Sequence, residues 1–275
     1  MPLLEPTPDA GFDALKAKLI ALTGWDLSRF KESYLRRRVG ARVRASGVLD
    51  WAAYGELLEK DRLELERLKD RLTVNVTEFM RDAEVWQALR QEVLPDIIRK
   101  AAARSLREVR IWSAGCSSGE EPYSLAMLAL EVVRAQAVAV EVKVLASDLD
   151  PIILERARQG HYETTALARV PEPLKNTYFL PDGAGWKAGP ALQRTVQFRG
   201  LDLFSSPAPP ALDLLLCRNV MIYFSRDLQQ KLLRSFHSAL VPGGIFVTGK
   251  TETVLGPVRT LFKCVSTRDR FFERV

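Results

Sequence analysis

The 275-residue chain contains only three cysteines and two histidines, which argues against several classes of protein. Cys116, Cys217 and Cys264 show no CxxC spacing, so neither a zinc site nor a disulfide framework is predicted. We therefore expect no metal and a reducing, cytoplasmic location. The sequence also lacks an apolar run of about twenty residues and a basic-then-apolar leader. Neither a membrane span nor secretion is predicted.

Positive charge is concentrated in one segment. The whole chain has a net charge of +6, and the stretch RFKESYLRRRVGARVR (residues 29–44) alone carries seven basic residues against one acid. A local patch of this kind attracts an acidic partner, such as an acidic protein face, an anionic lipid surface or a nucleic acid. The candidate partner-binding residues within it are Arg36, Arg37, Arg38 and Arg42.

Helical periodicity predicts that residues 1–72 form a small all-α domain. Before Gly24, apolar residues recur three or four positions apart, at Phe12, Leu15, Leu19 and Leu22. Asp50 is the predicted N-cap of a later helix. No strand pattern interrupts this region, so we expect a helical domain with one basic face.

From about residue 73 the pattern changes to strands that alternate with helices. Strands are predicted at residues 109–113, 142–147, 212–217 and 245–249. Helices are predicted at residues 121–135, 151–159 and 227–240. Such alternation favours right-handed crossovers and a mostly parallel sheet, which makes this an α/β domain. Residues 262–265 and 270–274 are expected to close the sheet as an antiparallel pair.

A segment at about residues 160–200 interrupts this alternation. It contains a Pro-Asp-Gly turn between short β-prone runs. We predict a small antiparallel β insert of three strands, at residues 178–180, 186–193 and 195–199.

The stretch IWSAGCSSGEEPYS (residues 111–124) joins the first predicted strand to its helix, where doubly wound sheets bind ligands. Gly115 and Gly119 would permit a close backbone approach to a ligand. Neither GxGxxG nor GxxxxGK[ST] is present. The helix opens with Glu120 and Glu121, which would repel a pyrophosphate, so a cationic ligand fits this loop better.

Polar residues also follow the next predicted strands. Asp148 ends the second strand, where a carboxylate accepts hydrogen bonds from ribose hydroxyls. Arg218 and Asn219 follow the third strand at the same expected edge of the sheet. A nucleoside with a positive centre and no phosphate meets these requirements, and S-adenosylmethionine is such a molecule.

Five stretches together resemble a known family. They are TVNVTEFMRD, WSAGCSSGEEPYSLA, ASDLD, CRNVMIYF and PGGIFVTGKTE. In this order, behind a basic helical domain, they resemble the chemotaxis receptor glutamate O-methyltransferases, the CheR-type family, over essentially the whole chain. The resemblance implies a Rossmann-like S-adenosylmethionine methyltransferase domain in residues 73–275, with S-adenosylhomocysteine as the product.

The resemblance also implies roles for individual residues. Glu120 would face the cofactor's amino group, and Asp148 would hold the ribose. Asp202, where the family often has asparagine, would flank the adenine. The cofactor-binding residues implied are Asn75, Thr77, Arg81, Gly115, Glu120, Asp148, Asp202, Leu203, Arg218 and Asn219. The candidate catalytic residues are Arg81 and Tyr223, with Tyr223 expected to orient the substrate carboxylate.

The implied substrate is the glutamate side chains in the cytoplasmic helical region of methyl-accepting chemoreceptors. The protein is then expected to be a monomer that neither inserts into membranes nor binds nucleic acid. Two alternatives remain open: an S-adenosylmethionine-binding scaffold without turnover, and a nucleic-acid methyltransferase that uses the arginines on phosphates. An NAD-dependent oxidoreductase is a weaker third, because GxGxxG is missing. No aromatic-rich or base-flipping motif accompanies the arginines, which argues against the second.

Overall fold

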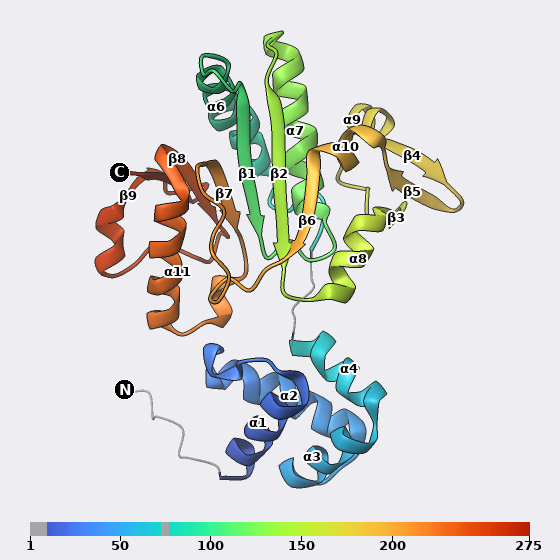
Figure 1. Ribbon diagram of the computed structural model, residues 1–275. Coiled ribbons are helices and arrows are strands. Elements are labelled where there is room, and N and C mark those ends of the chain that lie inside the picture. Colours follow the sequence, from blue (N-terminus) through green and yellow to red (C-terminus); the bar gives the residue numbers. More distant parts are fainter. Residues whose placement is uncertain (1–9, 73–76) are drawn as a thin grey trace. The chain divides into compact units, whose positions relative to one another are not determined.

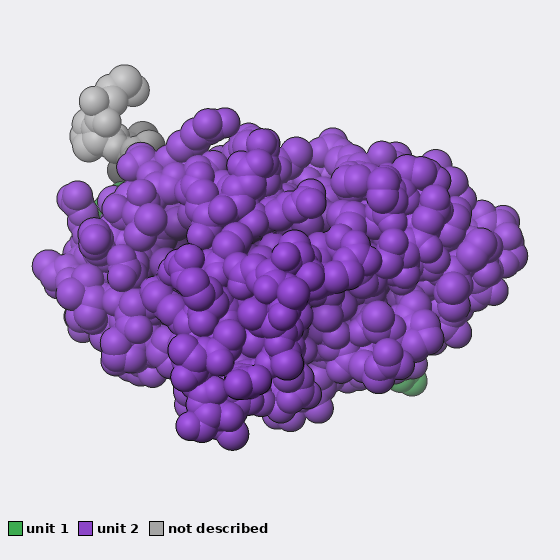
Figure 2. Space-filling model, turned by 90° about the horizontal axis from the view of Figure 1, so that it is seen from above, with its two compact units in different colours: residues 1–74, 223–228 green, residues 75–222, 229–275 purple. Residues whose placement is uncertain are grey.

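The computed structural model describes residues 10–72 and 77–275, and the chain divides into two compact units, coloured separately in Figure 2. The first unit comprises residues Met1–Val74 and Tyr223–Leu228, and the second comprises Asn75–Ile222 and Gln229–Val275. Within the described ranges, no helix combines the length and the apolar composition needed to cross a bilayer.

The first unit is helical, as predicted. Its helices are α1 (Ala10–Thr23), α2 (Glu32–Ser46), α3 (Trp51–Lys60) and α4 (Arg62–Leu72), with a 3-10 turn at Leu27–Arg29. The Asp50 side chain caps α3 by accepting a hydrogen bond from the Ala53 amide at 2.8 Å. The apolar faces of these helices bury Phe12, Leu19, Leu35 and Leu58 in one core.

A buried carboxylate, Glu64, lies at the centre of this unit. It accepts hydrogen bonds from Tyr54 Oη at 2.8 Å and from Arg42 Nε at 2.9 Å. Burial opposes the ionisation of Glu64. The hydrogen bonds from Arg42 and Tyr54, together with the charge of Arg42, outweigh burial and lower the pKa of Glu64. Arg42 is therefore part of the packing of the helical unit.

The second unit is built on a seven-stranded sheet (Figure 1). Its strands, in spatial order, are β6 (Val196–Gly200), β2 (Glu141–Asp148), β1 (Glu108–Ala114), β7 (Leu212–Cys217), β8 (Leu240–Thr248), β10 (Phe271–Arg274) and β9 (Phe262–Ser266). The first five run parallel, and β10 pairs antiparallel with both β8 and β9. The predicted parallel sheet with a closing antiparallel pair is confirmed.

Helices cover the sheet on both faces. The helices of this unit are α5 (Ala83–Ala88), α6 (Leu94–Ala102), α7 (Glu120–Gln136), α8 (Pro151–Gln159), α9 (Glu172–Tyr178), α10 (Pro190–Thr195) and α11 (Arg226–Ala239). A π-helical turn, Leu89–Val93, joins α5 to α6, and 3-10 turns occupy Met221–Tyr223 (η3) and Pro257–Leu261 (η4). Figure 1 shows α6 and α7 behind β1 and β2, with α11 in front of the sheet. On that front face, the rings of Phe236 and Trp112 are 5.5 Å apart.

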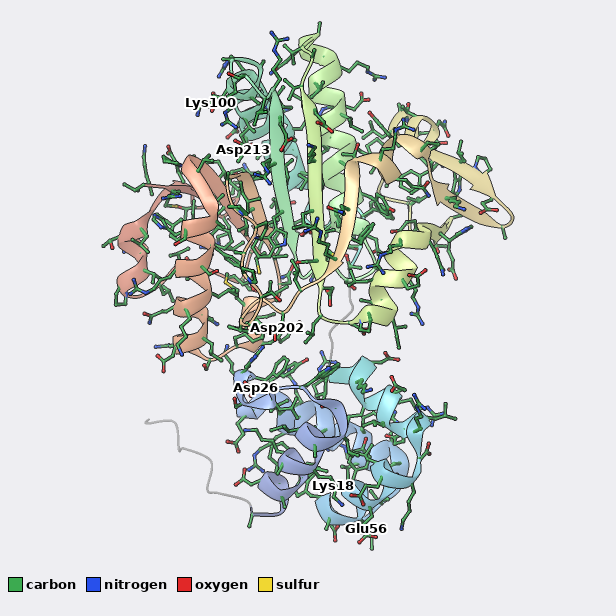
Figure 3. All side chains as sticks on the ribbon, viewed as in Figure 1. Lys18, Asp26, Glu56, Lys100, Asp202 and Asp213 are labelled. Atoms are coloured by element: carbon green, nitrogen blue, oxygen red, sulfur yellow. The ribbon has the colours of Figure 1, made fainter. Side chains whose placement is uncertain are left out.

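Strand β7, with the sequence LDLLLC, is buried along its whole length, as expected for a central parallel strand. Its one charged residue, Asp213, accepts hydrogen bonds from Arg104 Nη1 at 2.6 Å and the Arg110 amide at 2.9 Å. In Figure 3 Asp213 lies toward the upper ends of the strands, whereas Asp202 lies at the lower edge, where they terminate. Asp213 is thus separated from the edge where ligands bind in such sheets.

The predicted composition of the β insert is wrong in part. The insert is a three-stranded antiparallel sheet in the order β3 (His161–Glu163), β5 (Gly185–Ala188) and β4 (Phe179–Asp182). The run at residues 195–199 instead forms β6, which pairs parallel with β2 in the main sheet. Alternation within so short a strand reveals which residues face inward, but it does not reveal the sheet the strand joins.

Two boundaries near these strands also differ from expectation. The predicted strand 186–193 ends at Ala188, because Pro190 begins α10. The Pro-Gly-Gly segment, which separates the predicted helix 227–240 from the predicted strand 245–249, lies inside β8, where the register with β7 shifts between Leu212 and Leu214. Gly243 has φ of 75°, so a positive-φ residue permits the irregularity without ending the strand.

Candidate active site

The glycine loop lies between β1 and α7, at the carboxyl edge of the sheet. The Gly115 and Cys116 amides donate to the Ser147 carbonyl at 2.8 and 2.9 Å, which ties the loop to the end of β2. Gly115 has φ of 78°, and a Cβ there would lie 2.5 Å from Val220 Cγ2. Gly119 has φ of 97°, and its Cβ would lie 2.9 Å from Tyr162 Oη. Both glycines are explained by backbone conformation and by packing within the chain.

Two carboxylates flank this loop without a cationic partner. Asp148 accepts hydrogen bonds from the Ser117 amide at 2.9 Å and the Asp150 amide at 3.2 Å. Glu120 accepts from Ser118 Oγ at 2.7 Å and also from Thr77. Among the described residues, neither carboxylate forms an ion pair. Burial is the main cause of a raised pKa in both.

An unsatisfied hydroxyl lies in the same loop. Ser117 Oγ is buried and has no hydrogen-bond partner within residues 10–72 and 77–275, although the amide of the same residue is bonded to Asp148. A buried polar group without a partner indicates a missing ligand or water. Two carboxylates without cations and one unpartnered hydroxyl fit a ligand that is cationic and carries hydroxyl groups.

Arg81 lies in a strained turn that leads into α5. Met80 and Asp82, on either side of it, have φ of 53° and 61°, in the left-handed region that disfavours residues other than glycine. The turn is held by Trp86 Nε1, which donates to the Arg81 carbonyl at 2.7 Å, and by the Met80 amide, which donates to Ser124 Oγ at 3.1 Å. Such strain is costly and is typical of functional sites.

Arg218 holds the Arg81 turn against the start of α7. The side chain of Arg218 is 2% exposed, and its Nη2 lies 2.6 Å from Asp82 Oδ2 and 3.0 Å from the Arg81 carbonyl. Its Nη1 lies 3.4 Å from Glu121 Oε2, and its guanidinium carbon lies 5.5 Å from the centre of the Trp86 ring. Arg218 therefore anchors two segments of the site.

Glu121 is held by two side chains of the sheet edge, which indicates a structural role. Ser113 Oγ donates to Glu121 Oε1 at 2.8 Å, and Arg218 approaches the other oxygen. Burial raises the pKa of Glu121, while the Arg218 charge opposes that shift.

The remaining predicted residues of the second unit lie at the same edge of the sheet. The Leu201 amide donates to the Asp148 carbonyl at 3.0 Å, which brings Asp202 and Leu203 to the end of β2 (Figure 3). Asp202 Oδ1 accepts a hydrogen bond from the Phe204 amide at 2.9 Å. Asn219 follows β7 with φ of 61°. Asn75 lies outside the described residues.

Tyr223 belongs to the first unit. Its ring centre lies 4.8 Å from that of Tyr34, and its carbonyl accepts a hydrogen bond from the Lys31 amide at 2.9 Å. Tyr34 Oη donates to the Leu72 carbonyl, and burial raises the pKa of Tyr34 to about 12. The backbone and ring of Tyr223 are thus supported by the helical unit.

The four candidate docking arginines differ in exposure. Arg37 is exposed. Arg36 and Arg38 are half-buried, with Arg36 stacked 4.3 Å over the Phe12 ring and paired with Glu32 at 2.7 Å. Arg42 is paired with buried Glu64. Arg37 is therefore the one of the four that is exposed to an incoming partner, and the neighbouring turns of α2 add Arg44, which is also exposed.

The prediction from sequence missed three residues that shape the site. Asp82 and Ser124 hold the Arg81 turn, and Glu252 binds backbone amides after β7. Asp82 and Glu252 stand in the stretches TVNVTEFMRD and PGGIFVTGKTE, so their positions beside predicted site residues were a usable signal. Ser124, one turn into α7, carried no such signal.

The histidines and the cysteine nearest the loop do not supply a base or a nucleophile to this site. His161, in β3, is exposed, and His237, in α11, is half-buried. Burial raises the pKa of Cys116, which disfavours its thiolate. Within the part of the chain that the structure describes, no group of His, Cys, Asp and Glu side chains forms a metal site. The site offers carboxylates and hydroxyls to a ligand, and neither an imidazole base nor an activated thiol.

Among the described residues, the carboxyl edge of this Rossmann-like sheet presents carboxylates without ion pairs, and the sequence has no phosphate-binding glycine motif. These features agree with the S-adenosylmethionine-dependent methyltransferase class. Residues 75–271 match the family model described as CheR methyltransferase, SAM binding domain, and residues 10–73 match that of the CheR methyltransferase all-alpha domain. The chain belongs to the CheR methyltransferase family, and its cofactor is S-adenosylmethionine.

Curated relatives support this family assignment, and their similarity to the chain extends over most of their length. The chain is 32% identical to the chemotaxis protein methyltransferase of Listeria monocytogenes, over 85% of this chain and 86% of that protein. It is 35% identical to chemotaxis protein methyltransferase 2 of Pseudomonas aeruginosa, over 92% of this chain and 93% of that protein. The chemotaxis protein methyltransferase of Borreliella burgdorferi is 34% identical, over 85% and 84% of the two chains.

Proposed function

We propose that this methyltransferase methylates glutamate side chains in the helical cytoplasmic region of a chemoreceptor. The observation that carries the proposal is the pair of carboxylates, Glu120 and Asp148, which flank the glycine loop and form no ion pair with any described residue. They suit a ligand with a cationic amino-acid end and a ribose. The substrate is inferred from family membership and from the lack of a general base in the described site.

A glutamate acceptor requires little of the enzyme beyond position. Its carboxylate is ionised at neutral pH, since the reference pKa is about 4.3. The cofactor, when bound, supplies a methyl group on a sulfonium, which is a strong leaving group. The chain then has to align acceptor and donor and exclude water. Neither histidine is needed, which agrees with their location outside the site.

Each candidate residue has one task in this mechanism. Glu120 would accept hydrogen bonds from the cofactor's amino group, and Asp148 would accept them from the ribose hydroxyls. Arg81 would contact the methionine part of the cofactor, and Asn219 would help to complete the pocket. Arg218, in contrast, acts through Asp82 and the Arg81 carbonyl and is a positioning residue.

Calorimetric titration with S-adenosylmethionine, paired with radiolabelled methyl transfer to membranes that hold candidate chemoreceptors, tests the proposal. Binding together with base-labile methyl ester formation is expected. Binding without transfer to any receptor would favour the scaffold alternative, and methylation of RNA or DNA would favour the nucleic-acid alternative. Failure to bind the cofactor would contradict the proposal entirely.

The double substitution Arg37→Glu/Arg44→Glu is expected to reduce receptor methylation by about tenfold or more at low ionic strength, with cofactor affinity unchanged. Both side chains are exposed, so they attract an acidic receptor surface with little role in folding. The defect should shrink as salt screens the charges. Initial rates of methyl transfer at several salt concentrations measure this effect.

A matched control reverses the same amount of charge elsewhere, with Arg90→Glu/Arg194→Glu on exposed positions of the second unit. If both double variants lower methylation equally, the effect is one of net charge, and the role of the basic face of α2 is wrong.

The Tyr223→Phe variant is expected to reduce methyl transfer by about a hundredfold, because the hydroxyl that orients the substrate carboxylate is removed. Cofactor affinity should stay normal, since the ring still packs on Tyr34. Single-turnover rates and calorimetry on the same preparation separate the two quantities. Tyr178→Phe, which loses a hydroxyl bonded to Glu131 near the β insert, is the control. Unchanged turnover in Tyr223→Phe would contradict this role.

A further inference from the structure

A buried carboxylate with no assigned role, Glu252, joins the ends of β7 and β8. The residue is 4% exposed and lies just beyond β8. Its amide donates to the Gly249 carbonyl at 2.9 Å, so the chain turns back on itself after the strand. This turn returns the Glu252 carboxylate to the strand ends.

Every described donor to this carboxylate is a backbone amide. Glu252 Oε2 accepts from the Asn219 amide at 2.7 Å and from the Gly249 amide at 2.7 Å. Glu252 Oε1 accepts from the Ile222 amide at 3.1 Å, and the Met221 amide contributes as well. Within residues 10–72 and 77–275 the carboxylate forms no ion pair, so the ring of amides alone compensates its charge.

Three of these amides, those of Asn219, Met221 and Ile222, belong to the loop that leaves β7 toward the candidate catalytic residue Tyr223. Asn219 has φ of 61°, a conformation that residues other than glycine adopt at a cost. A hydrogen bond to its amide restrains that conformation. The next two amides held, those of Met221 and Ile222, lie in η3, which ends at Tyr223.

The packing around this contact leaves no free space. A Cβ at Gly249 would lie 2.7 Å from Glu252 Oε2 and 2.8 Å from the Asn219 amide nitrogen. Real Cβ contacts are essentially never this short, so residue 249 must be glycine for the three segments to meet.

We propose that Glu252 is a positioning residue for methyl transfer, whose carboxylate fixes the backbone of residues 219–222 so that Asn219 and Tyr223 are held for the reaction. The inference rests on the proposed function. Only a carboxylate supplies two acceptor oxygens and no donor here. A glutamine would turn an N–H toward at least one backbone N–H, and an aspartate is one carbon too short to preserve all of these contacts.

The test compares Glu252→Gln with wild type in the full-length protein. Affinity for S-adenosylhomocysteine is expected to fall about tenfold and kcat about a hundredfold, with KM for receptor membranes unchanged. All measurements are made well below the Tm of the variant, with the folded fraction verified by circular dichroism. Loss of Tm with normal affinity and normal kcat per folded molecule would mean a merely structural role and would overturn the proposal.

A second variant tests the same contact in case Glu252→Gln does not fold. Gly249→Ala pushes a methyl group into the same contact and should reproduce the split between kcat and KM. Gly55→Ala, where the nearest atom to the new Cβ is the flexible Lys18 Cδ at 3.1 Å, is the control and should keep wild-type kinetics. If wild type binds S-adenosylhomocysteine and both Gly249→Ala and Glu252→Gln react normally, the role of Glu252 is overturned. Absence of binding by wild type would overturn the proposed function instead.

Discussion

Replacing Glu120 with glutamine is expected to weaken S-adenosylmethionine binding by about 10- to 100-fold at neutral pH. The carboxylate is buried beside the glycine loop, bonded to Ser118 and Thr77 and to no cation of the described chain. A hydrogen bond to a charged group contributes about 1.5–3 kcal/mol, which corresponds to this range of affinity. Folding stability should hold or rise, because the protein no longer buries an uncompensated charge.

The matched substitution Glu121→Gln should have the opposite profile. Glu121 contacts Ser113 and Arg218 within the chain, so its loss is expected to lower the free energy of unfolding by about 1–3 kcal/mol. Its effect on cofactor affinity should be smaller than that of Glu120→Gln. Calorimetry and urea unfolding of both variants provide the comparison. Equal affinity losses would contradict the separate roles of the two adjacent glutamates.

The pH dependence of binding gives a further check on Glu120. Burial raises the pKa of this carboxylate in the free protein, and an ionised carboxylate is required to receive a cation. Affinity should therefore be full above the raised pKa and fall as the pH drops through it. The fall begins at higher pH than for an ordinary glutamate. In Glu120→Gln this slope should diminish, and the remainder belongs to Asp148, whose pKa burial also raises.

The sequence was most informative where function depends on local order along the chain. Asp50 could be identified as a helix cap, Glu120 as a carboxylate at a helix start and Asp148 as one at a strand end, because each lies at a fixed place relative to a helix or strand. The parallel sheet followed from the alternation of strands with helices. These features can be predicted without knowing which distant segments of the chain are in contact.

Features that depend on distant contacts could not be predicted in this way. Strand β6 was assigned to the insert because its sequence does not record that it pairs with β2. Arg42 resembles the exposed Arg37 in sequence, because its partner, the buried Glu64, lies on another helix. Glycine in the loop suggested room for a ligand, whereas Val220, a distant residue, explains why Gly115 has no side chain. In each case tertiary packing decided the outcome.

Arg218 is the clearest example of such a residue, and Arg218→Met is expected to destabilise the protein by about 3–5 kcal/mol. The guanidinium is buried and serves Asp82, the Arg81 carbonyl and Glu121 together. Removing one partner of a buried ion pair leaves an uncompensated charge, which costs about this much. Methionine preserves the apolar length of the side chain, so a cavity explains little of the loss. Urea unfolding at neutral pH measures the difference.

Arg234→Met is the control, because Arg234 is exposed on α11, and its effect should stay within about 0.5 kcal/mol. The double variant Arg218→Met/Glu121→Gln should recover part of the stability, since the unpaired carboxylate is then absent. A loss of stability in Arg218→Met no larger than that in Arg234→Met would contradict the anchoring role.

The pH dependence of Arg218→Met distinguishes lost charge pairing from lost packing. Burial already raises the pKa of Glu121, and the Arg218 charge is what opposes the shift. Without Arg218 the folded-state pKa rises further above the unfolded value, so the folded state binds a proton more readily. The defect should therefore be partly relieved below that raised pKa and be largest above it. A pH-independent defect would indicate packing alone, and the Arg81 turn would then owe its strained geometry to Trp86 and Ser124 rather than to the ion pair.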